Sequence, residues 1–302
     1  MKVTIDKKSG FCWGVVRTVD IAEQVLNDAK DSGKNTYILG HIIHNPKEIS
    51  RLEDKGLKTI SHSDLEEIAK KDKDANIIIR AHGEPPSTYQ KSAELGLKII
   101  DATCPLVTNL QNRVRKYYEL GYQIIIFGKR DHAEVIGLRG VCNDECIIIK
   151  SFEEAKQITQ FDRKTVFMSQ TTMDKQVFHQ IKEYLNTKIN DMIDLGSLDD
   201  KLLGRDTTCR AVTKRKEPLV EFAKSNDVMI FVSGKTSSNG KSLYQSCLEV
   251  NPKSYFIEDC NEIDWSWFEN AETVGITGAT STPHWYMEKV KEEIERRYNN
   301  TN

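Results

Sequence analysis

The sequence predicts an α/β protein made of three related lobes with parallel-rich sheets. Short β-rich runs alternate with segments of helical periodicity along the chain, which is typical of parallel sheets with helical crossovers. A motif also recurs, because DATCPLVT at 101–108 and DTTCRAVT at 206–213 share Asp, Thr, Cys, Val and Thr in register. Together with the CWGVV that starts at Cys12, these motifs place three cysteines at similar intervals. Three lobes of similar size are the simplest account.

Six β-rich runs have the length of buried strands and end in polar loops. They lie at 36–45, 76–86, 123–137, 165–173, 228–240 and 273–283. Helical segments are predicted at 15–26, 46–56, 87–96, 106–120 and 212–224. Ligands of such folds collect at the carboxyl ends of the strands, so the polar loops are where we expect chemistry.

The repeat also predicts the domain boundaries. We expect lobes at 13–98, 99–196 and 197–302, with residues 1–12 packed against the third lobe. If the lobes are related by a pseudo-threefold axis, the cysteines and polar loops converge on one central cleft.

Composition excludes several classes of protein. The 302 residues carry 43 Lys and Arg against 45 Asp and Glu, a net charge of −2, which disfavours a nucleic-acid binder. No apolar run approaches the roughly 20 residues that span a bilayer. The first residues, MKVTIDKKSGFCWGV, contain no signal-peptide core. We therefore expect a cytoplasmic protein that binds neither membrane nor nucleic acid.

The seven cysteines fall into two groups. Cys142 and Cys146 form a C-x3-C pair without a second Cys or His pair close by, so we interpret them, like Cys247 and Cys260, as packing residues. Cys12, Cys104 and Cys209 instead each open a helical segment.

Three such thiolates suit either a substrate-binding 4Fe–4S cluster with one open iron or a closed Cys3His zinc site, and they can also be unligated. Their wide separation along the chain favours the cluster, because distant ligands meet where lobes meet.

Small or cationic hydrogen-bond donors follow the predicted strands and suit a phosphate or diphosphate. They are His44, His82, Ser237, Ser238, Asn239, Thr280, Ser281 and Thr282. His132 and Glu134 supply a general-acid pair in another of these loops. GKTSSNGKS is similar to a P-loop but has the wrong spacing, which disfavours ATP chemistry.

A series of motifs runs along the chain from Gly10 to about Val290: GFCWGV, IIHNPKEISRLEDKG, RAHGEPP, DATCPLVT, HAEVIGLRG, SQTT, DTTCRAVTKR, SSNG and GITGATSTP. This series resembles that of the 4-hydroxy-3-methylbut-2-enyl diphosphate reductase (LytB/IspH) family. The resemblance implies a trefoil of three α/β lobes around a central cleft. It also implies a 4Fe–4S cluster held there by Cys12, Cys104 and Cys209, with one iron open.

The family's reaction removes the hydroxyl of an allylic alcohol that bears a diphosphate, the last step of the non-mevalonate isoprenoid pathway. The resemblance implies that the diphosphate is bound by His44, His82, Ser237, Ser238, Asn239 and Ser281. Glu134 would deliver protons to the leaving hydroxyl, with Thr171 hydrogen-bonded nearby and His132 in support. Ferredoxin or flavodoxin would donate the electrons, and we expect a monomer.

The chain also departs from the family pattern at Trp13, Arg80, Val212 and Lys216, and we expect an additional loop at 190–205. Two other functions remain open: a non-catalytic iron–sulfur sensor on the same scaffold, and a zinc-stabilised sugar-phosphate or nucleotide binder.

Overall fold

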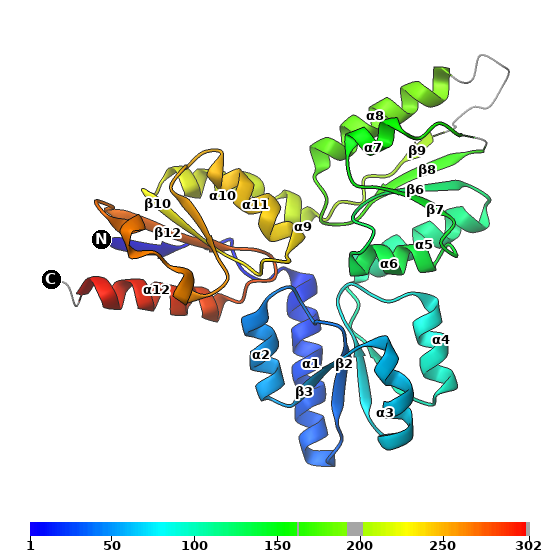
Figure 1. The fold of residues 1–302 in the computed structure, drawn as a ribbon, viewed down its shortest axis with the longest axis horizontal. Coiled ribbons are helices and arrows are strands. Elements are labelled where there is room, and N and C mark those ends of the chain that lie inside the picture. Colours follow the sequence, from blue (N-terminus) through cyan, green and yellow to red (C-terminus); the bar gives the residue numbers. More distant parts are fainter. Residues whose placement is uncertain (162, 192–201, 300–302) are drawn as a thin grey trace. The chain divides into compact units, whose positions relative to one another are not determined.

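The computed structural model describes residues 1–161, 163–191 and 202–299, in which strands and helices alternate along the chain (Figure 1). The chain forms two compact units, one of Met1–Thr59 with Arg210–Asn302 and the other of Ile60–Cys209. The described strands form three four-stranded sheets, and the strand pairs within each unit are parallel. The predicted α/β class with parallel sheets is therefore confirmed.

One sheet lies wholly in the first unit and has the strand order β1-β12-β10-β11. Its strands are β1 (Lys2–Ile5), β10 (Val228–Val232), β11 (Ser254–Ile257) and β12 (Thr273–Gly278). Helix α12 (His284–Asn299) packs on one face, while α10 (Lys216–Lys224) and α11 (Ser238–Leu248) pack on the other. Since successive strand residues point to opposite faces, Ile230 packs toward α12 and Phe231 toward α10 and α11.

A second sheet lies wholly in the second unit and has the order β7-β6-β8-β9. Its strands are β6 (Gln123–Phe127), β7 (Cys146–Ile149), β8 (Thr165–Ser169) and β9 (Leu202–Gly204). Helices α5 (Pro105–Glu119) and α6 (Ala133–Gly140) cover one face. Helices α7 (Phe152–Lys156) and α8 (Lys175–Asp191) cover the other face, so both sides of the sheet are buried.

The remaining sheet has the order β3-β2-β4-β5. Its strands are β2 (Thr36–Leu39), β3 (Leu57–Ile60), β4 (Asn76–Ile79) and β5 (Lys98–Asp101). The helices in this part of the sequence are α1 (Trp13–Ser32), α2 (Pro46–Asp54), α3 (Leu65–Lys71) and α4 (Pro86–Glu94), with the 3₁₀ turn η1 (His62–Asp64). Among the described residues, no helix is both long enough and apolar enough to cross a membrane.

The six predicted β runs form the two inner strands of each sheet, namely β10 and β12, β2 and β4, and β6 and β8. Inner strands of a helix-covered parallel sheet are buried on both faces, which is why they are nearly continuous apolar runs. The edge strands were not predicted, because they are short and partly exposed. Strand β5, for example, has the sequence KIID and no fully buried residue.

The helical segment predicted after Cys209 is divided into α9 (Arg210–Thr213) and α10 (Lys216–Lys224). Pro218 explains the break, because proline has no N–H to donate to the carbonyl four residues earlier, and its ring clashes with that carbonyl. Much of the additional loop expected at 190–205 lies outside the described residues, and Leu202–Gly204 near its end forms strand β9.

Candidate active site

Three cysteines lie at helix starts, as the sequence predicts. Cys12 and Cys104 are the N-cap residues of α1 and α5, and Cys209 immediately precedes α9. All three are partly exposed. Cysteine ligates metals through its thiolate sulfur, so partly exposed cysteines are candidate metal ligands.

The cysteines interpreted as packing residues lie in different surroundings. Cys142 and Cys247 are fully buried in the apolar cores of their units, and Cys146 and Cys260 pack against those cores at the starts of β7 and of the 3₁₀ turn η2 (Cys260–Glu262). Burial raises the pKa of Cys247 to about 12, so this group remains a neutral thiol. Their prediction as packing residues is confirmed.

In the second unit, Glu134 is a buried carboxyl group held by one partner. It lies in the first turn of α6 and is 1% exposed. Its two carboxylate oxygens accept hydrogen bonds of 2.7 Å from the backbone N–H and the hydroxyl of Thr171. Burial raises the pKa of Glu134 to about 7, against the opposing effect of these two hydrogen bonds. Glu134 can therefore hold a proton near neutral pH and release it, as a general acid must.

His132 joins this acid to a second histidine. It is the N-cap residue of α6, and its Nδ1 accepts a hydrogen bond of 3.2 Å from the backbone N–H of Glu134. The rings of His82 and His132 meet edge to face, with centroids 5.2 Å apart. An Nδ1 that accepts a hydrogen bond leaves Nε2 to carry the proton of a neutral imidazole. The two histidines and the acid thus form one group.

Backbone hydrogen bonds tie two of the cysteines to the same group. The N–H of Cys104 donates to the carbonyl of Ala81, beside His82, at 3.0 Å. The N–H of Cys209 donates to the carbonyl of Thr171 at 2.8 Å. Contacts through the backbone of both cysteines therefore connect them with the buried acid inside the second unit.

Glycines allow the elements of this group to pack closely. A Cβ atom on Gly140 of α6 would lie 2.2 Å from the Cβ of Pro85, and one on Gly137 would lie 2.6 Å from the amide nitrogen of Gln111. That amide, which belongs to α5, donates to the carbonyl of Glu84 at 3.4 Å. Helix α6, which carries Glu134, therefore packs directly against the segment that follows His82.

In the first unit, two loops bring small polar groups together at the carboxyl ends of β10 and β12. The Oδ1 atom of Asn239 accepts hydrogen bonds from the N–H and the hydroxyl of Thr280, at 3.0 and 2.9 Å. Its amide nitrogen is buried and has no partner among the described residues. An unsatisfied buried donor is costly, so this amide nitrogen is a candidate donor to a ligand or to water.

The neighbouring hydroxyls have different roles. Ser237 is the N-cap residue of α11 and accepts from the N–H of Gly240 at 3.0 Å, so Ser238 begins a helix whose positive end suits an anion. The Thr280 hydroxyl is used by Asn239, and that of Thr282 donates to the carbonyl of Val232. Both threonines thus hold the loops in shape.

His44 and Cys12 lie against these loops. The hydroxyl of Ser281 donates to the carbonyl of His44 at 3.5 Å, and the N–H of Cys12 donates to the carbonyl of Thr280 at 3.1 Å. A Cβ atom on Gly234 would lie 2.2 Å from the His44 carbonyl oxygen. The structure thus gathers the first unit's predicted residues into one group and the second unit's into another.

Replacing Gly234 by Ala is expected to displace the His44 loop, since the new methyl group would meet backbone atoms that cannot rotate away. We expect a loss of about 2–3 kcal/mol in urea unfolding, as for other overpacked sites, together with weaker binding of inorganic pyrophosphate. The control is Gly33→Ala. A Cβ atom at Gly33 would meet open space, so the strain comes from the positive φ of 64° alone. It should cost roughly 1 kcal/mol and leave pyrophosphate binding unchanged. Equal pyrophosphate binding by both variants would contradict the prediction.

Sequence reasoning missed a buried carboxylate beside His82. Glu84 is 3% exposed, accepts a hydrogen bond from Nε2 of His62 at 2.7 Å, and lies 3.6 Å from the guanidinium of Arg80. The hydrogen bond to Glu84 raises the pKa of His62. Arg80, a departure from the family pattern, thus has a buried counter-charge. Glu84 belongs to the RAHGEPP motif, but only its burial shows that it is the partner of His62 and Arg80.

Comparison with known proteins gives a match over nearly the whole chain. The family model described as "LytB protein" matches residues 3–295. The 4-hydroxy-3-methylbut-2-enyl diphosphate reductase of Chlorobium phaeobacteroides (strain DSM 266 / SMG 266 / 2430) is 42% identical and covers 99% of both chains. That of Pelodictyon phaeoclathratiforme is 41% identical, again over 99% of both chains.

Two solved structures are similar as well. One is a structure of (E)-4-hydroxy-3-methyl-but-2-enyl diphosphate reductase, described as the terminal enzyme of the non-mevalonate pathway. It is 32% identical, with a TM-score of 0.70 over 98% of this chain and 100% of that chain. The other is the E-1-hydroxy-2-methyl-but-2-enyl-4-diphosphate reductase of Plasmodium falciparum, 25% identical, with a TM-score of 0.80 over 97% of this chain and 87% of that chain.

Proposed function

Because the chain belongs to the LytB protein family, we propose that it is a 4-hydroxy-3-methylbut-2-enyl diphosphate reductase. Such an enzyme replaces the allylic hydroxyl by hydrogen and gives isopentenyl and dimethylallyl diphosphate. Two electrons and two protons enter, one proton leaves with the hydroxyl as water, and the other is added to the allyl unit. The observation that supports this function best is the buried Glu134, which holds a proton near neutral pH and is linked to two cysteines.

The cofactor of this proposal is a 4Fe–4S cluster held by Cys12, Cys104 and Cys209. The residues fit it, because three partly exposed cysteines at helix starts offer soft sulfur ligands suited to iron–sulfur clusters. When bound, a cluster with one iron free of protein ligands supplies single electrons and a Lewis-acidic site for an oxygen atom.

The diphosphate is assigned to His44, His82, Ser237, Ser238, Asn239 and Ser281. The buried amide of Asn239 and the start of α11 support the assignment, because both present N–H donors suited to phosphate oxygens. The diphosphate is remote from the bond that breaks, so its binding energy can orient the reacting end of the substrate.

The proton that converts the hydroxyl to water comes from Glu134 in this proposal. The Thr171 hydroxyl, 2.7 Å from the carboxyl, can turn to accept that proton while donating its own to the substrate. His132 fixes the first turn of α6 and so the direction of the acid. Burial of Glu134 keeps bulk water away from this proton path, so that protons do not reach the substrate by other routes.

The remaining assignments concern organisation and partners. We propose a trefoil of lobes at 13–98, 99–196 and 197–302, and the pairing of β1 with β12 supports assigning residues 1–12 to the third lobe. We further propose a cytoplasmic monomer that receives electrons from ferredoxin or flavodoxin and binds no nucleic acid. A non-catalytic sensor on this scaffold would give no role to an acid with the burial and partners of Glu134.

The decisive test is purification without oxygen, followed by iron and sulfide analysis and by turnover with a one-electron donor and the hydroxylated allylic diphosphate. We expect a brown protein with iron and sulfide in cluster ratio that forms both products. Iron and sulfide without turnover would favour the sensor. A colourless, zinc-containing protein would overturn the proposal in favour of a zinc-stabilised binder.

A further inference from the structure

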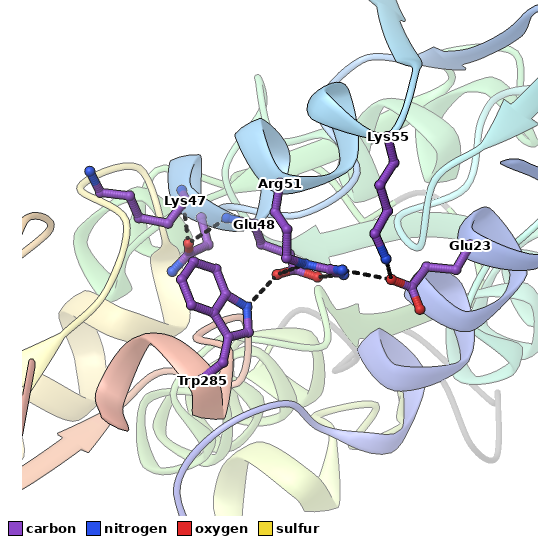
Figure 2. Close-up of polar contacts among 7 residues, drawn as sticks. Glu23, Lys47, Glu48, Arg51, Lys55 and Trp285 are labelled. Carbon is purple, nitrogen blue, oxygen red and sulfur yellow. Dashed lines mark hydrogen bonds and ion pairs between the residues drawn. The ribbon is translucent and has the colours of Figure 1, made fainter. Parts of the chain in front are cut away.

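A buried carboxylate, Glu48, joins two helices of the first unit (Figure 2). It lies in the first turn of α2 and is 1% exposed. Its Oε2 atom accepts hydrogen bonds from the indole Nε1 of Trp285, at 2.8 Å, and from Nε of Arg51, at 2.9 Å. Its Oε1 atom accepts from Nη2 of Arg51 at 2.6 Å. This fork and the indole give the carboxylate three hydrogen bonds, which fix its direction.

The network continues from α2 to a third helix. Arg51 also donates through Nη1 to Glu23 of α1 at 2.6 Å, and Lys55 donates to the same oxygen at 2.6 Å (Figure 2). The hydrogen bond with Glu48 raises the pKa of Arg51, so the guanidinium remains charged. Two acids and two bases alternate, which lets a carboxylate be buried without an uncompensated charge.

Each connected helix begins close after a predicted site residue. Cys12 is the N-cap residue of α1, and Asn45, the N-cap residue of α2, directly follows His44. Helix α12 begins at His284, and Trp285 is its second residue, just beyond the loop that carries Ser281. The bond between Glu48 and Trp285 therefore spans the first turns of the helices that follow these two loops.

Other contacts also hold the His44 loop near Ser281. The hydrogen bond between the two residues is long, at 3.5 Å, and the packing of His44 on Gly234 limits how close the loops come. The ion pair of Lys47 with Asp259 is a second tie, but both side chains are about one-third exposed, so water weakens it. Of these ties, the one at Glu48 has a buried acceptor, because Glu48 is 1% exposed and accepts three hydrogen bonds.

We propose that Glu48 is a positioning residue for diphosphate binding, acting through Trp285 to hold the His44 loop in register with the Ser281 loop. This inference rests on the proposed function. Donors fixed in place before the ligand arrives bind it without a further loss of conformational freedom, so loosening them weakens affinity. Neither Glu48 nor Trp285 needs to touch the substrate.

The test uses the cluster-loaded enzyme, with inorganic pyrophosphate as the probe. Trp285→Phe removes one N–H and keeps an aromatic ring, while Glu48→Gln removes the charge that Arg51 pairs with. We expect pyrophosphate affinity and the KM for substrate to worsen by about tenfold in Glu48→Gln and by a few-fold in Trp285→Phe, with kcat at saturation within about twofold of wild type. If the bond between Glu48 and Trp285 holds the two loops in register, adding Trp285→Phe to Glu48→Gln should weaken pyrophosphate binding little further.

Matched controls come from the same unit. Glu53→Gln alters an exposed carboxylate on α2, and Trp267→Phe alters an indole that stacks on Tyr255. Both should bind pyrophosphate like wild type. Should Glu48→Gln fail to fold, Trp285→Phe still decides the matter.

The possible outcomes separate the two proposals. Wild-type turnover together with unchanged pyrophosphate affinity in both network variants would overturn the positioning role alone, even if the variants unfold more easily. A wild-type enzyme that neither turns over nor binds pyrophosphate would overturn the proposed function and this inference with it. Weaker pyrophosphate binding with unchanged iron content would support both.

Discussion

Replacing Glu134 by Gln is expected to lower kcat by about 10²–10⁴-fold, the usual contribution of a positioned general acid. Glutamine has nearly the same shape, and its amide can still pair with the N–H and hydroxyl of Thr171, so packing should be kept. It cannot release a proton near neutral pH. Iron content and pyrophosphate affinity should therefore stay within about twofold of wild type.

The pH dependence of stability and of activity provides a second test of the role of Glu134. Burial raises the pKa of Glu134 from its ordinary 4.5 to about 7, so the folded protein holds this proton more tightly than the unfolded chain does. Its contribution to stability is therefore fully present below pH about 4.5 and is lost as the pH rises through about 7. Wild-type activity should likewise decline above pH about 7, as the acid loses its proton.

Glu134→Gln should lack both of these effects. The measurements are kcat against pH and urea unfolding against pH for the two proteins. Full turnover by the variant, or the same pH profile in both proteins, would remove Glu134 from the proton path.

Replacing Cys104 by Ser is expected to abolish turnover, with a loss of more than about 100-fold, and to remove most of the bound iron. A serine hydroxyl is a hard, protonated ligand that replaces a thiolate poorly in an iron–sulfur site. Serine is also a favoured N-cap residue, so α5 should still begin at Pro105. Loss of the cluster can thus be separated from loss of the helix.

The measurements are the visible absorbance, iron and sulfide content, and circular dichroism of protein purified without oxygen. Cys260→Ser is the matched control, because Cys260 is also partly exposed but starts a 3₁₀ turn beside the first unit's core. It should keep its iron and its activity. Equal iron loss in the two variants would contradict the division of the cysteines into ligands and packing residues.

Local sequence patterns were sufficient for the inner framework of the fold. The runs that became β10 and β12 could be recognised because a strand buried on both faces must be apolar throughout. The same reasoning failed for β5 and β9. These strands lie at sheet edges, where a strand does not have to be apolar throughout. It also missed the break between α9 and α10, where the lack of a donor at Pro218 outweighs helical periodicity.

The candidate site divides in the same way. The repeated motif places Cys104 and Cys209 before helical segments, and the family series names Glu134 and Asn239 from the sequence alone. The pKa of Glu134 and the orientation of Asn239, however, are set by residues that are distant in the sequence. Burial raises the pKa of Glu134 against the two hydrogen bonds from Thr171, which lower it, and the orientation of Asn239 depends on Thr280.

Residue types at short or repeated spacing are enough to predict the fold class, the inner strands, the three cysteines at helix starts and the family. The burial of Glu134, the hydrogen bonds from Thr280 to Asn239, and the bond from Trp285 of α12 to Glu48 of α2 exist only in the folded chain. The physical reason is that burial and hydrogen-bond partnership are set by residues that are distant in sequence and become neighbours when the chain folds.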